Sequence, residues 1–142
     1  MVPLFTIILI KKERERMVSM KFYKCETCGN IIEMVNDAGV KPVCCGNEME
    51  EVKCNTDDSG AKEKHVPVVK QEGYVLTVLV GEKPHPMSTE HFIEWIEVET
   101  NKGSYRKCLK PNDLPSATFV LDKDENFVKA YAYCNIHGLW CV

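Results

Sequence analysis

Short runs of apolar and β-branched residues, separated by polar turn-forming residues, dominate the pattern along this chain. Residues 74–80 (YVLTVLV) are a continuous apolar run, which is typical of a buried strand. Residues 93–100 (IEWIEVET) alternate between apolar and polar, which is typical of a half-exposed strand. Further short strands are predicted at residues 22–24, 31–35, 104–109, 117–121 and 127–133. Proline and glycine interrupt the helical windows, so the pattern predicts an all-β fold.

Turn-forming residues join these strands at short intervals. Residues 101–103 (NKG) and 123–126 (KDEN) have the composition of hairpin connections. Several short strands with turn signals at such spacing predict a small β-sandwich.

The chain divides by composition into three parts. Residues 1–19 hold a nine-residue apolar stretch followed by KKERER. This stretch is too short to span a bilayer and lacks the flanks of a signal peptide, so we expect a disordered N-terminal extension or a misassigned start. Residues 20–55 form a Cys-rich unit, and residues 56–142, beginning with the polar linker TDDSGA, form the larger domain.

Charge and cysteine content narrow the functional class. The net charge of −3 and the pI near 5.8 argue against general nucleic-acid binding, which depends on basic surfaces. The chain has eight cysteines, and their C-x-x-C and Cys-Cys spacings fit metal ligation better than disulfides. Such usage indicates a reducing compartment.

Four cysteines in the small unit form the first candidate site. Cys25 and Cys28 make a C-x-x-C motif, and fifteen residues separate it from the adjacent Cys44 and Cys45. Four thiolates in tetrahedral geometry bind zinc or iron, and the spacing by itself favours a structural zinc ribbon without deciding the metal. A unit of this size rarely folds on an apolar core alone, so metal binding would supply much of its folding free energy.

The second candidate site joins all four histidines of the chain with one cysteine. Its members lie in the loop-like segments EKHVP, KPHP, STEH and CNIHG, and they are His65, His85, His91, Cys134 and His137. Any one histidine alone would be read as a surface or core residue. Together, four imidazoles and one thiolate suit iron, copper or zinc. Five ligands on an octahedral metal leave one position open, which predicts chemistry on a small molecule. A divalent metal with four neutral imidazoles and one thiolate keeps a net positive charge, so the site favours an anion.

Charged and sulfur-bearing residues outside these sets have two interpretations. Glu63 and Lys64 precede His65 and are either a solvated pair, or a closing ligand and a cationic lure that raises the on-rate of an anion. We expect Cys54 and Cys108 to be small buried side chains or free thiols, and Cys141 to be exposed and prone to oxidation.

Several motifs, in order, carry a resemblance to desulfoferrodoxins, the two-domain superoxide reductases. They are YKCETCGN, VCCGNEM, AKEKHVPV, HPM, HFIEWIEV, LKP and YCNIHGLW, and the similarity extends over residues 20–142. The resemblance implies a desulforedoxin-like domain followed by an immunoglobulin-like β-sandwich. No family counterpart is recognised for residues 1–19.

The resemblance also assigns the two sites. It implies iron in both, Fe(Cys)₄ in the small domain and Fe(His)₄(Cys) in the large one, with the imidazoles equatorial and Cys134 axial. Glu63 corresponds to the family's carboxylate ligand of ferric iron, and Lys64 to its superoxide-guiding lysine. The implied activity is one-electron reduction of superoxide to hydrogen peroxide at the open position opposite Cys134. Backbone N–H groups near Asn135 and Ile136 are expected to tune the sulfur.

Partners and location follow from the same resemblance, which implies a homodimer in the cytoplasm and a rubredoxin-like electron donor. Neither a nucleic acid nor a membrane is expected as a partner. Three alternatives remain at this stage: an iron protein that only transfers electrons, a zinc-stabilised interaction module, and a superoxide dismutase.

Overall fold

The computed structural model describes Pro3 and residues 20–142. Apart from Pro3, the predicted extension at residues 1–19 lies outside the described residues. The chain separates into two compact units, which meet at Glu51–Val52. We call residues 20–51 the small unit and residues 52–142 the sandwich unit.

The small unit is a set of very short strands around its cysteines. Its strands are β1 (Phe22–Lys24), β2 (Ile31–Glu33), β3 (Val43–Cys44), β4 (Asn47–Glu48) and β5 (Glu50–Val52). They form a three-stranded sheet in the order β2-β1-β5 and the separate hairpin β3-β4. Its buried cluster contains only Tyr23, Cys25 and Met49, with Ile32, Met34 and Cys44 packed against it. So small an apolar core agrees with the need for metal inferred from the size of this unit.

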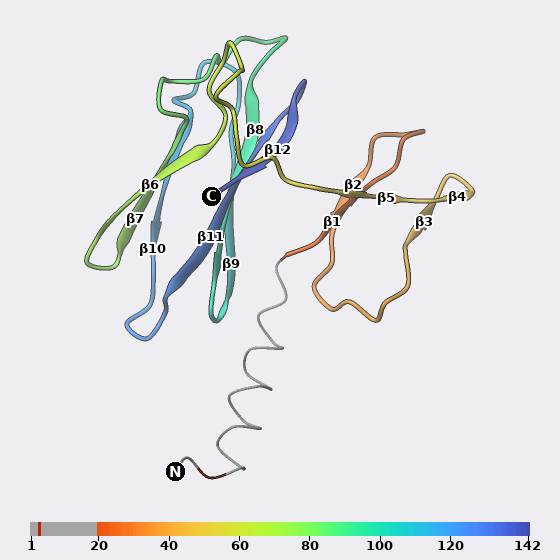
Figure 1. The fold of residues 1–142 in the computed structure, drawn as a ribbon, viewed down its shortest axis with the longest axis horizontal. Coiled ribbons are helices and arrows are strands. Elements are labelled where there is room, and N and C mark those ends of the chain that lie inside the picture. The colour runs from red at the N-terminus through yellow and green to blue at the C-terminus, as the bar shows by residue number, and fades with distance from the viewer. Residues whose placement is uncertain (1–2, 4–19) are drawn as a thin grey trace. The chain divides into compact units, whose positions relative to one another are not determined.

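Two antiparallel sheets make up the sandwich unit (Figure 1). The first has the order β10-β7-β6 and the second β12-β11-β8-β9. Their bounds are β6 Pro67–Glu72, β7 Val75–Val80, β8 Ile93–Thr100, β9 Gly103–Cys108, β10 Ser116–Val120, β11 Phe127–Cys134 and β12 Gly138–Cys141. Seven antiparallel strands split three and four make an immunoglobulin-like sandwich, but β9 pairs with β8 and not with β10, which differs from the constant-type arrangement. The described residues contain no helix, so the all-β prediction is confirmed.

The core lies between the two sheets and is built from alternate residues of the central strands. In β7, Leu76, Val78 and Val80 are fully or almost fully buried, while Thr77 and Leu79 on the other face are half-buried and Val75 is exposed. The continuous apolar run therefore belongs to a strand with one covered face, and the prediction that the whole run is buried is wrong. Ala130, Ala132 and Cys134 of β11 face the same core. The sulfur of Cys134, a candidate metal ligand, is therefore part of the core.

Strand β8 shows the opposite departure. Its apolar/polar alternation predicts a half-exposed strand, yet Glu97 and Glu99 are only 1% and 8% exposed. Glu97 accepts hydrogen bonds from Ser104 and Arg106 of β9, at 3.0 and 3.4 Å, and Tyr131 of β11 donates to Glu99 at 3.1 Å. Neighbouring strands thus satisfy the buried carboxylates, and sequence alternation alone does not reveal such partners.

One predicted hairpin is confirmed and the other is wrong. Asn101 and Lys102 connect β8 to β9, whose pairing begins at Thr100↔Gly103. Residues 123–126 instead carry the chain from β10 in one sheet to β11 in the other. Glu125 anchors this crossing, because its carboxylate accepts hydrogen bonds from Thr100 Oγ1 and Tyr105 OH at 2.5 and 2.6 Å.

A close backbone approach positions the segment that carries Lys64 and His65. The Asp58 carboxylate accepts the backbone N–H groups of His65 and Val66 at 2.6 and 2.9 Å. On the other side, Gly81 follows β7 directly, and a Cβ added to it would lie 2.8 Å from the Lys64 carbonyl carbon. The segment is therefore held between a carboxylate and a glycine that leaves room for it.

We expect Gly81→Ala to destabilise the sandwich unit, because the added methyl group meets backbone atoms that a side-chain rotation cannot move away. Overpacking of this kind costs about 1–3 kcal/mol, measurable as a lower midpoint in denaturant unfolding. Gly60→Ala is the matched control, since a Cβ at Gly60 meets nothing within 4 Å. Equal midpoints for the two variants would contradict the predicted clash.

Candidate metal centres

The four cysteines of the small unit converge on one point. Their sulfur atoms all lie within 4.8 Å of one another. Cys28 Sγ is 3.6 Å from Cys44 Sγ, which in turn is 4.0 Å from Cys45 Sγ. A tetrahedron with metal–sulfur bonds of about 2.3 Å has edges of about 3.8 Å, so these separations leave room for one ion among the sulfurs.

Local backbone geometry brings the cysteines together. Gly29 has a φ of +81°, which lets the chain turn directly after Cys28. The Gly29 N–H donates to the Cys25 carbonyl at 2.9 Å. Cys45 itself adopts a φ of +51°, which is unusual for a residue with a side chain. This conformation separates the thiols of adjacent residues.

The acid–base behaviour of this cluster also fits a cation. A hydrogen bond from the Cys28 backbone N–H, with further hydrogen bonds, lowers the pKa of Cys25 to about 6. Hydrogen bonds with the Cys28 and Cys25 side chains raise the pKa of Cys45 to about 12. One thiolate among these sulfurs therefore opposes ionisation of its neighbours, and a bound cation would relieve that repulsion.

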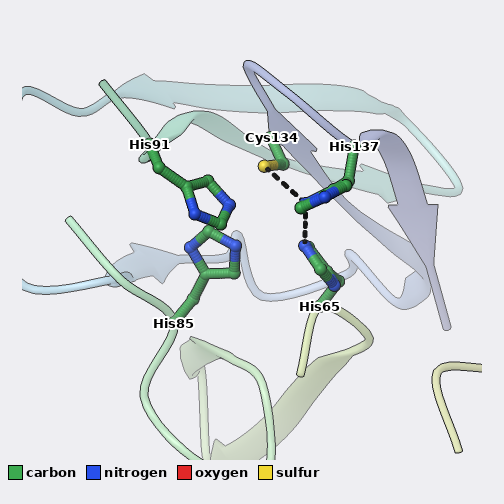
Figure 2. Close-up of side chains that lie close together, drawn as sticks. All are labelled: His65, His85, His91, Cys134 and His137. Carbon is green, nitrogen blue, oxygen red and sulfur yellow. Dashed lines mark hydrogen bonds between the residues drawn. The ribbon is translucent and has the colours of Figure 1, made fainter. Parts of the chain in front are cut away.

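Loops at one end of the sandwich unit bring the five members of the second set together (Figure 2). His65 lies just before β6, and His85 and His91 lie in the loop between β7 and β8. Cys134 ends β11, and His137 lies in the turn to β12. Gly138, with a φ of +79°, closes this turn. The ligand-type atoms of all five residues lie within 4.8 Å of one another.

The four imidazoles are arranged as a square. Ring-centroid distances between successive members (65–85, 85–91, 91–137 and 137–65) are 4.6, 4.7, 5.0 and 4.9 Å. The distance across the square, from His65 to His91, is 6.5 Å. His65 Nε2 and His137 Nδ1 are 3.1 Å apart, close to the separation of about 3.0 Å for two nitrogens at right angles about an ion 2.1 Å away. Cys134 Sγ is the fifth atom, 3.7 Å from His137 Nδ1.

Buried nitrogen atoms in this square have no hydrogen-bond partner. Among the described residues, His85 Nε2 and His91 Nε2 are buried and unpaired. His85 Nδ1–H donates to the Pro86 carbonyl at 2.7 Å, so the Nε2 lone pair faces the centre. Burial, outweighing this hydrogen bond, lowers the pKa of His85 to about 4, which keeps the ring neutral. Neutral imidazoles with free lone pairs are what a transition metal requires.

The sulfur of Cys134 is fixed by the core on one side and by the turn on the other. Burial raises the pKa of its thiol, while hydrogen bonds from the backbone N–H groups of His137 and Ile136 act to lower it. The expectation for Ile136 is confirmed. That for Asn135 is wrong, because its N–H donates instead to the Phe92 carbonyl at 3.2 Å.

The site reaches the surface on one side. His65, His85 and Cys134 are buried, His91 is half-buried and His137 is exposed. Part of the site therefore lies at the surface, at the β11–β12 turn that carries His137.

Glu63 and Lys64 are both half-buried beside this site. Burial is the main cause of the shifted pKa values of His65, His85 and Cys134, and the Glu63 charge raises the pKa of each. The Lys64 ammonium donates to the Asp58 carbonyl at 3.1 Å.

Sequence patterns missed three residues that position the site. Asp58 belongs to the segment predicted to be a linker, and its carboxylate accepts the His65 backbone N–H. Asn135 bridges two loops, since its side chain accepts from the Phe92 N–H and donates to the Glu90 carbonyl, both at 2.9 Å. Trp140 stacks on His65, with ring centroids 4.5 Å apart and planes 12° apart. An Asp in a turn-rich segment and an Asn next to a ligand were the available signals.

The remaining cysteines differ from expectation in two respects. Cys54 and Cys141 form a disulfide, and Cys141 is fully buried rather than exposed. Cys108 is a free thiol but is exposed. Pairing of residues 87 apart depends on tertiary structure, so their spacing carried no signal.

Comparisons with known proteins cover both units. The family model "Desulfoferrodoxin" matches residues 57–142, and "Desulfoferrodoxin, N-terminal domain" matches residues 18–52. A desulfoferrodoxin homolog from Archaeoglobus fulgidus is 50% identical over 121 residues, covering 85% of this chain and 94% of that protein. The desulfoferrodoxin of Nitratidesulfovibrio vulgaris is 48% identical over 120 residues, covering 84% and 93%.

A solved structure extends the likeness to the fold. The crystal structure of the superoxide reductase from Treponema pallidum has a TM-score of 0.75 and 31% identity, covering 87% of this chain and 98% of its own. With two family models matching in order and relatives near 50% identity over most of their length, the chain belongs to the desulfoferrodoxin family.

Proposed function

We propose that this protein is a superoxide reductase, which reduces superoxide by one electron to hydrogen peroxide. The observation that carries the proposal is the square of four imidazoles with one buried cysteine sulfur, in which His137 is exposed. Its members, the proposed ligands of one iron, are His65, His85, His91, Cys134 and His137. A second iron would be held by Cys25, Cys28, Cys44 and Cys45, whose sulfurs lie within 4.8 Å of one another. The superoxide reductase of Treponema pallidum supports this activity.

Iron in the five-ligand site supplies the electron and an open coordination position for the substrate. The protein's own groups set the conditions for this chemistry. Neutral imidazoles leave the site positively charged, which favours an anion over neutral solutes. The Cys134 thiolate donates electron density, and the N–H groups of Ile136 and His137 restrain that donation. Exposure of His137 admits water, the source of the protons that the product needs.

Lys64 and Glu63 are proposed to act on the substrate side. The Lys64 charge attracts superoxide, and its hydrogen bond to Asp58 holds the ammonium beside the segment that carries His65. The influence of the Glu63 charge on the pKa values of three proposed ligands supports a carboxylate close enough to close the site after turnover. These roles follow the family resemblance and remain proposals of function.

The proposal also covers the two domains, the electron donor, the oligomeric state and the location of the protein. We assign the Fe(Cys)₄ domain to residues 20–55 and the reductase domain to residues 56–142. The family resemblance supports a rubredoxin-like donor, a homodimer and a cytoplasmic location. Among described residues, no helix has the length and apolar character to cross a membrane. Val35, Val40 and Val43 of the small unit are 89%, 73% and 67% exposed, which supports a contact surface for a second copy.

Product stoichiometry tests the proposed activity. The iron-loaded protein, given a superoxide source and excess reductant, is expected to yield one hydrogen peroxide per superoxide and to evolve no oxygen. A dismutase would evolve oxygen without consuming reductant. A protein that only transfers electrons would have a closed second site, whose spectrum azide or cyanide leaves unchanged. Elemental analysis is expected to find near two irons per chain, and zinc alone would contradict the proposal.

We expect Lys64→Ala to slow superoxide capture at low ionic strength by roughly tenfold or more, since electrostatic steering contributes factors of about 10–10³. The salt dependence of the rate should become flatter at the same time. Stopped-flow or pulse-radiolysis measurement of the second-order rate checks this. Lys62→Ala is the matched control, because it removes the same charge from an exposed side chain two residues away. An unchanged low-salt rate in Lys64→Ala would refute steering by this residue.

We expect Cys134→Ser to lose the thiolate-to-iron absorption band and to lower activity by roughly tenfold or more, since removing even an outer partner of a metal ligand costs about 10–100-fold. Visible absorption and the superoxide assay measure the two effects. Cys108→Ser, at an exposed thiol outside both sets, should keep both. Retention of band and activity in Cys134→Ser would reassign the sulfur ligand.

A further inference from the structure

Two cysteines outside both proposed iron sites are joined to each other. Cys54 follows β5, and Cys141 is the last residue of β12. Their disulfide spans a sequence separation of 87, so it links the two ends of the sandwich unit. Cys141 is fully buried, whereas Cys54 is half-buried and within reach of solvent.

Backbone hydrogen bonds hold these two cysteines in register independently of the S–S bond. The Asn55 N–H donates to the Leu139 carbonyl and the Cys141 N–H donates to the Asn55 carbonyl, both at 2.9 Å. Asn55 and Trp140 form an isolated parallel bridge. The Cα atoms of Cys54 and Cys141 are 5.7 Å apart, an ordinary spacing for a disulfide. After reduction of the S–S bond, these backbone contacts would keep the two thiols close together, so that oxidation can form the bond again.

This pair lies next to the proposed reductase site along the chain. Trp140, the residue before Cys141, stacks on His65 at 4.5 Å between ring centroids. Asp58 holds the His65 backbone, four residues after Cys54. The disulfide therefore joins the segment that contains Asp58 to the segment that contains Trp140, and both of these residues contact His65.

We propose that Cys54 and Cys141 form a reversible dithiol–disulfide pair that is oxidised by hydrogen peroxide. The inference rests on the proposed function in one respect, since that function makes peroxide close to these thiols. In a reducing compartment a disulfide is typically transient or redox-sensing rather than permanent. The low exposure of Cys141 leaves Cys54 as the thiol that peroxide meets first.

The reaction balances without a further reactant. The Cys54 thiolate attacks one peroxide oxygen, so an S–O bond forms, the O–O bond breaks and one water leaves after protonation. The Cys141 thiolate then attacks the Cys54 sulfenic sulfur, so the S–S bond forms, the S–O bond breaks and a second water leaves. Two thiols are oxidised by two electrons as one peroxide is reduced. A dithiol reductant reverses the change by exchange.

Formation of the disulfide would stabilise the sandwich unit while hydrogen peroxide, the product of the proposed activity, accumulates. A link across so long a segment restricts the unfolded chain, and the chain-entropy account gives larger effects for longer loops. The disulfide form is expected to have the higher Tm, by on the order of 10 °C. It also restrains β12, and with it the ring that packs on His65.

The test uses the full-length, iron-loaded protein. After dithiothreitol treatment and desalting under nitrogen, one half receives a small molar excess of hydrogen peroxide. Both halves are alkylated with N-ethylmaleimide, digested and analysed by mass spectrometry. The expected result is a cross-linked Cys54–Cys141 peptide only in the peroxide-treated half, together with the higher Tm. A link that dithiothreitol cannot open, or peroxide that yields over-oxidised Cys54 without the link, would overturn the proposal.

Matched variants separate this pair from the other thiols. Cys108→Ser should form the link and show the full Tm shift, because Cys108 is an exposed thiol outside the pair. Cys54→Ser should show neither, and Cys54→Ala provides a second variant should the serine form be poorly folded. A redox-dependent Tm shift that persists in both Cys54 variants would overturn the assignment.

A third arm separates this inference from the proposed function. A superoxide source with reductant replaces the added peroxide, and catalase is included in a parallel sample. Formation of the link that catalase suppresses supports the inference. If added peroxide forms the link but superoxide turnover produces none of it, the thiol chemistry stands and the proposed function fails.

Discussion

Burial of metal-binding nitrogens without any other partner is the constraint on which the sandwich unit depends. His85 Nε2 and His91 Nε2 lie inside the protein with no hydrogen bond among the described residues. Leaving such a group unpaired costs about 1–3 kcal/mol each, and burial has already removed the alternative of protonating His85. A metal ion bound by these nitrogens would offset this cost, which would make metal binding part of folding.

The sandwich makes this arrangement possible because the sulfur lies in its core and the imidazoles lie on its loops. Cys134 belongs to the apolar core between the sheets, which fixes the sulfur. The histidines lie on loops at one end of the sheets, where backbone can bend freely. Asp58, Asn135 and the close approach at Gly81 then remove that freedom. The core fixes the sulfur, and contacts of the loops fix the imidazoles. Such a fixed set of five ligand atoms suits a metal that must keep one position open.

The small unit meets the same constraint with far less structure. Its apolar cluster has three buried residues, and its strands are two or three residues long. Hydrogen bonds with the Cys28 and Cys25 side chains hold the pKa of Cys45 near 12, while the backbone N–H of Cys28 lowers that of Cys25 to about 6, so the four thiols do not all ionise readily without a cation. A bound metal would therefore contribute to the fold of the small unit as well.

The sequence by itself predicted both candidate ligand sets, whose members the structure brings together, and it determined the β-class of the fold, because ligand chemistry and strand periodicity are local properties of residues. Most predicted strands agree with the structure to within two residues. Short strands such as β3, β4 and β12 were missed, since two to four residues carry no readable period. Only the tertiary structure decided that Glu97 and Glu99 are buried, that residues 123–126 cross between sheets, and that Cys54 meets Cys141. Each of these depends on a partner distant in sequence, and a single residue's surroundings do not encode which distant segment will cover it.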